Sequence, residues 1–190
     1  MAKSGERKAQ ILQTLAAMLE DPKGERITTA LLAARLEVSE AALYRHFTSK
    51  AQMFEGLIEF IEQTVFTLVN KIQVEEKDAM KQIESTITTL LGFAQKNPGM
   101  TRVLIGDALV NEDERLQSRV NQLLDRLEAT LRQSARLAIT SGILPGDWDV
   151  NAYANAMIAF VVGRWHQFAK SGFKRAPLDG WPQQWRVFAA

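Results

Sequence analysis

One short run of small, polar and basic residues is the part of this sequence whose residue types and spacing point to a chemical role. Residues 39–47 read Ser-Glu-Ala-Ala-Leu-Tyr-Arg-His-Phe, and helical spacing places Leu43 and Phe47 on one face. Arginine and tyrosine can donate hydrogen bonds to phosphates and base edges, and small alanines permit close approach to thymine methyl groups. The run therefore predicts a face that contacts nucleic acid. The side chains left for this contact are Ala41, Ala42, Tyr44 and Arg45.

The sequence contains no arrangement typical of catalysis or metal binding. Its only histidines are His46 and His166, no carboxylate lies at ligand spacing beside His46, and cysteine is absent. We find no nucleophile with a base and a carboxylate, and no phosphate-binding loop. We therefore expect a protein that is not an enzyme and that uses no metal or cofactor.

Three short helices are predicted to position the residues of this run. Apolar residues from Ile11 to Leu19 indicate a first helix, and a second begins at Thr28 or Thr29. Ser39 is a favourable N-cap for a third helix of about nine residues. A second helix, a tight turn and a capped third helix form the arrangement that places the third helix across a DNA major groove. The predicted DNA-contacting residues are Thr28, Thr29, Ser39, Ala41, Ala42, Tyr44, Arg45, His46 and Lys50.

A long fourth helix follows. Residues 49–52 read Ser-Lys-Ala-Gln, which predicts a capping box, and the helix start is itself suited to bind a phosphate. Apolar residues at spacings of three and four, including Leu68, continue to Ile72 and predict about six helical turns. Phe60 lies off this stripe. It is therefore either an exposed apolar anchor or part of the core.

The remainder of the chain also shows helical periodicity, which predicts an all-α fold. Residues 149–170 are apolar almost all round, so this helix must be covered on both sides. We expect a two-fold partner to cover one side, with the tryptophans at the interface, although they could instead form an intramolecular core. The predicted dimer contacts are Tyr153, Met157, Phe160, Val161 and Trp165.

Composition and charge limit the function classes without selecting one. Of 190 residues, 46% are hydrophobic and 24% charged, which is ordinary for a folded globular protein. The first fifty residues contain eight lysines and arginines against six acidic residues, too small an excess to indicate nucleic-acid binding by itself. The polar start lacks the apolar segment of a signal peptide, and the longest apolar run has eight residues. We expect a DNA-binding domain over residues 1–48 and a dimerising, partner-binding domain over residues 49–190.

The residues quoted so far resemble the TetR family of bacterial regulators. The resemblance covers Leu32-Ala33, Val38-Ser39, residues 43–47 and Lys50, followed by the long fourth helix. Glu37 stands where a turn glycine is usual, and Thr48 replaces a usual proline. Further segments resemble the nucleoid-occlusion factors within that family. These are residues 26–30, 38–47, 57–62, 90–93, 97–102 and 115–117.

This resemblance implies a cytoplasmic, nucleoid-associated homodimer that binds palindromic chromosomal sites. When bound, it would antagonise polymerisation of the tubulin-like division protein FtsZ. The alternative is a TetR-type repressor that releases DNA when a small molecule binds its body. The resemblance places the FtsZ-facing surface along the fourth and fifth helices, where Lys96 and Asn97 could equally be a solvated helix end. The implied FtsZ contacts are Phe60, Gly92, Lys96, Asn97 and Arg102.

Overall fold

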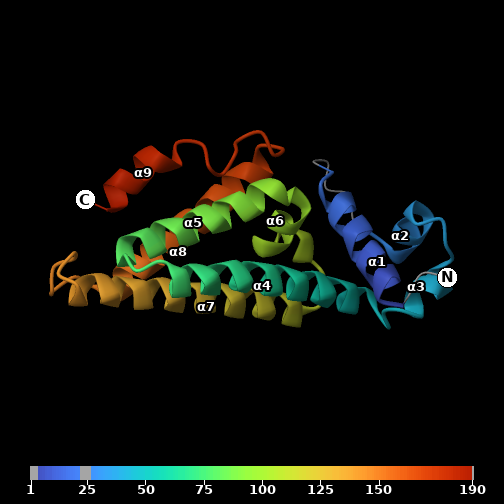
Figure 1. Ribbon diagram of the computed structural model, residues 1–190. Helices are drawn as coiled ribbons and strands as arrows, with labels where there is room; N and C mark the ends of the chain where they lie inside the picture. The colour runs from blue at the N-terminus through green and yellow to red at the C-terminus, as the bar shows by residue number, and fades with distance from the viewer. Residues whose placement is uncertain (1–3, 22–26, 190) are drawn as a thin grey trace. The chain divides into compact units, whose positions relative to one another are not determined.

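The computed structural model describes residues 4–21 and 27–189, and every regular element among them is helical (Figure 1). The all-α prediction is therefore confirmed. The first four helices are α1 (Ser4–Leu19), α2 (Thr29–Arg35), α3 (Glu40–Tyr44) and α4 (Lys50–Glu75). They are followed by α5 (Ala79–Lys96), α6 (Pro98–Leu104), the short 3₁₀ helix η1 (Asp107–Leu109), α7 (Glu114–Thr140), α8 (Val150–Lys170) and α9 (Trp181–Phe188).

Packing divides the chain into two compact units. The first contains residues 1–61 and 97–120, and the second contains residues 62–96 and 121–190. The boundaries fall inside α4 and α7. The functional boundary expected after residue 48 stays a prediction, because a unit defined by packing need not coincide with the segment that contacts a ligand.

In the first unit, α6 packs closely against α1. A Cβ added at Gly99 would lie 2.0 Å from the carbonyl oxygen of Ala16, so only glycine fits there. The Arg102 guanidinium donates to the carbonyl oxygens of Leu19 and Asp21, at 3.3 and 3.2 Å, and thereby satisfies two acceptors at the end of α1. These contacts fix the helix that precedes the predicted helix-turn-helix.

In the second unit, α5 and α8 lie side by side (Figure 1). The Trp165 indole N–H donates to the carbonyl oxygen of Leu90 at 3.2 Å, so its polar atom is satisfied inside the core. Arg164 secures the connection between α8 and α9, because its guanidinium donates at 2.7 to 3.1 Å to three carbonyl oxygens of that connection. The three acceptors belong to Ala176, Pro177 and Asp179.

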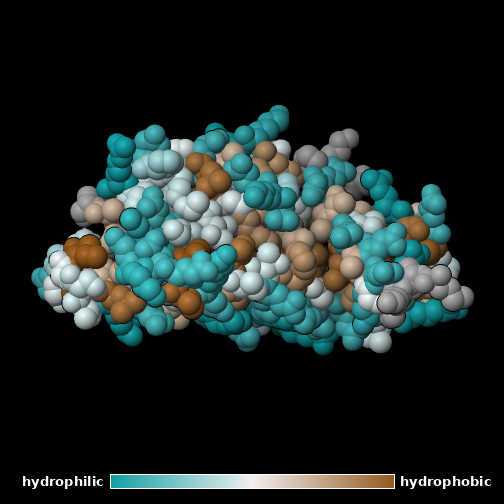
Figure 2. Space-filling model, in the orientation of Figure 1, coloured by the Kyte–Doolittle hydropathy of each residue, from teal (hydrophilic) through white to brown (hydrophobic). Residues whose placement is uncertain are grey.

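Leu68, predicted to belong to the apolar stripe of α4, lies on the surface, as does Leu137 on α7. Leu68 is 43% exposed and Leu137 is 44% exposed, whereas the next residues, Val69 and Ala138, are fully buried. The buried stripe advances by four residues from Val65 to Val69, which leaves Leu68 outside it. On the face shown in Figure 2, hydrophobic atoms form separate patches among hydrophilic ones. Within the described residues, we find no helix both long and apolar enough to cross a bilayer.

Candidate nucleic-acid and protein interfaces

Two hydroxyl caps define the second and third helices. Thr28 precedes α2 and accepts a hydrogen bond from the Leu31 N–H at 3.2 Å. Ser39 precedes α3 and accepts from the Ala42 N–H at 3.3 Å, as predicted. The third helix covers only residues 40–44 and is shorter than the expected nine residues. It ends at Tyr44, and the chain then continues as a turn to the N-cap of α4.

In the turn between α2 and α3, Glu37 occupies the position where a glycine is usual in the family. Its φ is 55°, in the left-handed region that favours glycine. The Glu37 N–H donates to the Ala34 carbonyl and the Val38 N–H donates to the Ala33 carbonyl, at 3.1 and 3.0 Å. This is the Schellman arrangement, which requires a left-handed residue directly after the helix cap. The fold therefore imposes the conformation despite the side chain.

The third helix buries one face and presents the other. Leu43 and Phe47 are buried, as predicted, whereas Tyr44 is 45% exposed and is not a core aromatic. The Tyr44 hydroxyl donates to Thr29 at 3.5 Å, and the Thr29 hydroxyl donates to the Glu40 carboxylate at 2.6 Å. Among the other predicted contact residues, Ala41 and Arg45 are exposed, and Ala42 and His46 are half-buried. Their contact with DNA stays a prediction.

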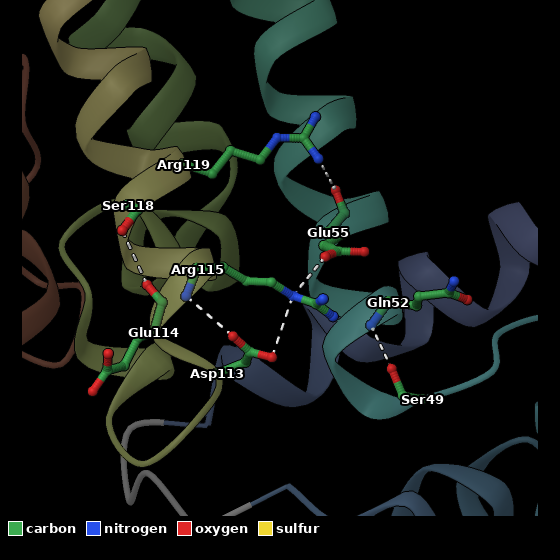
Figure 3. Close-up of polar contacts among 8 residues, drawn as sticks. All are labelled: Ser49, Gln52, Glu55, Asp113, Glu114, Arg115, Ser118 and Arg119. Carbon is green, nitrogen blue, oxygen red and sulfur yellow. Dashed lines mark hydrogen bonds and ion pairs between the residues drawn. The ribbon is translucent and has the colours of Figure 1, made fainter.

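The start of α4 shows most of the predicted capping box. The Ser49 hydroxyl accepts from the Gln52 N–H at 3.1 Å (Figure 3). The Gln52 side chain reaches back to the N–H of Thr48, at 2.9 Å, one residue before the expected cap N–H. Both bonds satisfy donors that would otherwise be left open at the helix start. They fix the backbone on which Lys50 stands.

Lys50 is paired inside the chain. Its ammonium group forms an ion pair with the carboxylate of Glu112, which lies between η1 and α7. It also lies 5.6 Å from the ring centroid of Phe54, within the range of a cation–π interaction. No local pattern signals the acidic partner, because Lys50 and Glu112 are 62 residues apart.

A second set of contacts joins α4 to the start of α7. Figure 3 shows the Arg115 guanidinium between Glu55 and Asp113, with distances of 3.0 and 3.2 Å from its Nε to the two carboxylates. The Arg119 guanidinium donates to the backbone carbonyl of Glu55 at 3.4 Å. These contacts hold the beginning of α7 against the first turns of α4.

The residues implied for FtsZ binding differ in their surroundings. Phe60 on α4 is 47% exposed, which excludes the alternative that it belongs to the core. Lys96 is exposed at the end of α5. Asn97 is half-buried and occupies the N-cap position of α6. A Cβ at Gly92 would meet Leu178 at 3.8 Å, which is ordinary contact, so nothing there requires glycine.

Arg102 has a structural position that the sequence did not predict. Besides the two carbonyl oxygens at the end of α1, its guanidinium Nε donates to the Asp107 carboxylate at 2.8 Å, and its side chain is 15% exposed. With these groups engaged, Arg102 supports the packing of α1, and its implied contact with FtsZ stays a prediction. The family resemblance pointed to Arg102 as a functional residue but gave no sign of its hydrogen-bond partners within the chain.

The expected dimer contacts require a correction. Tyr153, Met157, Val161 and Trp165 are buried within the single chain, so they have almost no surface left to contribute to a dimer. Phe160 packs against the rings of Trp181 and Phe188, with centroid distances of 5.5 and 5.1 Å. The tryptophans at 165, 181 and 185 therefore form an intramolecular core. Most of the large apolar side chains of α8 are thus covered by elements of its own chain, whereas Phe160 and Val162 are half-buried.

One exposed face of α8 consists of small residues. Ala152, Ala156, Ala159 and Gly163 recur at spacings of four, three and four, which places them on one side of the helix. A Cβ at Gly163 would meet no other atom within 4 Å. This pattern was visible in the sequence, but the large apolar residues were a stronger signal for an interface.

Among the described residues, Tyr153 is the side chain whose pKa is clearly shifted. Burial disfavours the charged phenolate and raises the pKa of Tyr153 to about 12. Its hydroxyl donates to the Phe188 carbonyl at 3.1 Å and so joins α8 to the end of α9. This contact engages Tyr153, first expected at the dimer interface, inside its own chain.

Solved structures of regulators share this fold. The structure of the TetR family transcriptional regulator PfmR from Thermus thermophilus has a TM-score of 0.79, with 20% identity over 94% of this chain and 96% of that one. A TetR transcription regulator from Haloarcula marismortui has a TM-score of 0.81, with 16% identity over 97% of both chains. At these identities the likeness shows the fold alone.

Sequence comparison is more specific. Residues 23–57 match the family of bacterial regulatory proteins of the tetR type, and residues 77–190 match the SlmA-like tetracyclin repressor-like C-terminal domain. The nucleoid occlusion factor SlmA of Marinomonas sp. strain MWYL1 is 50% identical over 188 residues, which covers 98% of this chain and 95% of that protein. SlmA of Alteromonas mediterranea is 51% identical over 186 residues, with the same shares covered.

These relatives are regulators, which agrees with the expectation that the chain is not an enzyme. The match to them extends over both packing units, since it covers nearly the whole chain. The chain therefore belongs to the SlmA family of TetR-type nucleoid occlusion factors.

Proposed function

We propose that this protein binds palindromic chromosomal sites as a cytoplasmic, nucleoid-associated homodimer and, when bound, antagonises FtsZ polymerisation, blocking division over the nucleoid. The near-complete coverage of SlmA relatives at about 50% identity is the observation that carries the proposal. The candidate interfaces described above supply residues for each step.

DNA binding is assigned to α3 and the start of α4. The exposed side chains of Ala41, Tyr44 and Arg45 are available to a duplex, while buried Leu43 and Phe47 hold the helix in place. Further donors to the DNA backbone are the hydroxyl groups of Thr28, Thr29 and Ser39 and the ring of His46. Two of these residues, Thr28 and Ser39, also cap helices. Lys50 would contact a phosphate at the start of α4.

Dimerisation is assigned to the exposed small-residue face of α8, in place of the buried residues first expected. Small side chains let two helices approach closely, and a two-fold contact uses the same face on both protomers. A two-fold dimer also suits a palindromic site, with half-sites about 34 Å apart or a small multiple of it.

FtsZ binding is assigned to Phe60 and, separately, to Lys96. An exposed phenylalanine can be buried by a partner segment, and a lysine can form a charge-assisted contact with an acidic one. Truncating Phe60 should cost about 1 to 3 kcal/mol of FtsZ binding. DNA affinity should not change, because Phe60 lies outside the predicted DNA-contacting set.

The test measures fluorescence anisotropy of a labelled FtsZ C-terminal peptide with the full chain, with and without saturating DNA. Phe60→Ala is compared with Val187→Ala, which truncates another exposed apolar residue on a different helix. Lys96→Glu is compared with Lys81→Glu, which reverses an exposed charge on the same helix. We expect weaker peptide binding for the first member of each pair only.

A parallel titration with labelled duplex DNA should give equal affinities for all four variants. If the wild type bound DNA but no FtsZ peptide, even when saturated with DNA, a ligand-responsive TetR-type repressor would be the better interpretation. Equal peptide affinities for Phe60→Ala and Val187→Ala would remove Phe60 from the FtsZ surface.

A further inference from the structure

Glu112 already forms an ion pair with Lys50, the residue that we assign to a contact with a DNA phosphate. The side chains of Lys50 and Glu112 are only 21% and 12% exposed. Solvent and salt screen such a partly buried pair less than a pair on the open surface. The charge of Lys50 is therefore largely neutralised before any DNA arrives.

Both members of the pair stand on a fixed backbone. Lys50 is the first residue of α4, directly after the Ser49 cap. The Glu112 N–H donates to the Leu109 carbonyl at 3.0 Å, and the next residue, Asp113, accepts from the Arg115 N–H at 3.1 Å. The backbone on both sides of the contact is thus anchored by hydrogen bonds.

The segment that carries Glu112 contains a left-handed residue and borders a cavity. Asn111, directly before it, has a φ of 65°, a left-handed conformation that asparagine tolerates better than most residues. Lys50 and Glu112 line a cavity of about 210 Å³ together with Phe54 and Arg102. This space allows either side chain to change position without displacing the packed core.

We propose that Glu112 is an internal substitute for a DNA phosphate, which neutralises Lys50 in the free protein and must share or release its ammonium group when duplex DNA binds. The proposal rests on the assignment of Lys50 to a phosphate contact. Glu112 then lowers DNA affinity, because binding must weaken an ion pair and leave a poorly solvated carboxylate without its full partner.

The exchange has a distinct salt signature. A lysine that neutralises a phosphate releases a counterion and steepens the dependence of log K on log salt by about 0.9. When Lys50 pairs with a DNA phosphate, the Glu112 carboxylate loses its partner and takes up a cation from solution. This uptake offsets part of the counterion release from the DNA. Removing the charge of Glu112 should therefore tighten DNA binding and make it more salt-dependent.

The experiment titrates a labelled random-sequence duplex with the full chain between about 50 and 200 mM salt, a range over which phosphate contacts dominate. Glu112→Gln keeps the side-chain size and removes the charge. Glu114→Gln is the matched control, because it removes an exposed charge two residues away, in the first turn of α7. Lys50→Ala and the double variant Lys50→Ala/Glu112→Gln complete the set.

We expect Glu112→Gln to bind about 3- to 10-fold more tightly than the wild type at low salt, with a slope steeper by up to about 0.9. Glu114→Gln should change binding less, and the Glu112→Gln effect should vanish in the Lys50→Ala background. If circular dichroism showed that Glu112→Gln does not fold, Glu112→Asp, which shortens the same carboxylate, should tighten binding to a smaller degree.

If Glu112→Gln matched Glu114→Gln while the wild type bound DNA, the inference would be wrong and the proposed function would stand. The same holds if the Glu112→Gln effect persisted without Lys50, since it would then reflect only the overall charge. A wild type that binds no duplex at all would remove the proposed function and this inference together.

Discussion

Gly99 lies against the backbone of Ala16 with no room for a side chain, since an added Cβ would fall 2.0 Å from the Ala16 carbonyl oxygen. Backbone atoms cannot move aside as a flexible side chain can, so Gly99→Ala must separate α6 from α1. We expect a loss of at least about 2 kcal/mol in the free energy of unfolding, measured in urea, because overpacking of this kind is strongly destabilising.

Gly92 provides the matched control on a neighbouring helix. A Cβ there would meet Leu178 at an ordinary 3.8 Å, and alanine favours a helix interior over glycine. Gly92→Ala should therefore be neutral or stabilise the fold by up to about 1 kcal/mol. Similar destabilisation by both substitutions would show that the close approach at Gly99 is not the cause.

Glu37 adopts a left-handed conformation that costs a residue with a side chain about 1 kcal/mol. Glu37→Gly should recover much of this cost and raise the midpoint of thermal unfolding. Asn111→Gly, also at a positive φ, should gain less because asparagine already tolerates the conformation. An unchanged or lower midpoint for Glu37→Gly would mean that the side chain stabilises the turn by more than the strain costs.

Charge on the small-residue face of α8 should separate the proposed dimer without unfolding the chain. Ala159 is exposed, so Ala159→Arg leaves the core intact but places two arginines together across a two-fold contact. Light scattering should report monomers, with the helical circular dichroism retained. Asn70→Arg, an exposed position on α4, should keep the mass of the wild type. A dimer of Ala159→Arg would place the interface elsewhere.

Tyr153 should make the fold sensitive to alkaline pH. Because its pKa is about 12 in the folded chain and 10.0 ordinarily, its contribution is fully present below pH 10 and is lost as the pH rises through about 12. The difference in the free energy of unfolding between the wild type and Tyr153→Phe should shrink over this window. A difference that stays constant with pH would show that Tyr153 ionises alike in both states.

Sequence reasoning succeeded where the determining contacts are local. The Ser39 cap, the strained turn at Glu37 and the burial of Leu43 and Phe47 each depend on residues within a few positions along the chain. Helical periodicity also predicted the all-α fold correctly. The partner of Lys50 could not be predicted in this way, because 62 residues separate it from Glu112.

The error about α8 has a different physical origin. The apolar pattern of residues 149–170 correctly indicated that α8 is covered on more than one side, but it could not identify the elements that cover the helix. Trp165 bonds to α5 and Phe160 packs on α9, so the chain covers those faces by itself. For Phe60 the offset from the buried stripe left two alternatives, an exposed anchor or a core residue. The structure shows that it is exposed, while its binding partner stays a prediction.

The three carbonyl oxygens held by Arg164 also bear on how the protein is degraded. The guanidinium is one of several groups that hold this segment, so its loss should lower the free energy needed to open the C-terminal segment ahead of the rest of the second unit. Opening would uncover Trp181 and Trp185, the kind of aromatic surface that chaperones and proteases recognise. We therefore expect loss of the Arg164 contacts to shorten the lifetime of the protein in the cell.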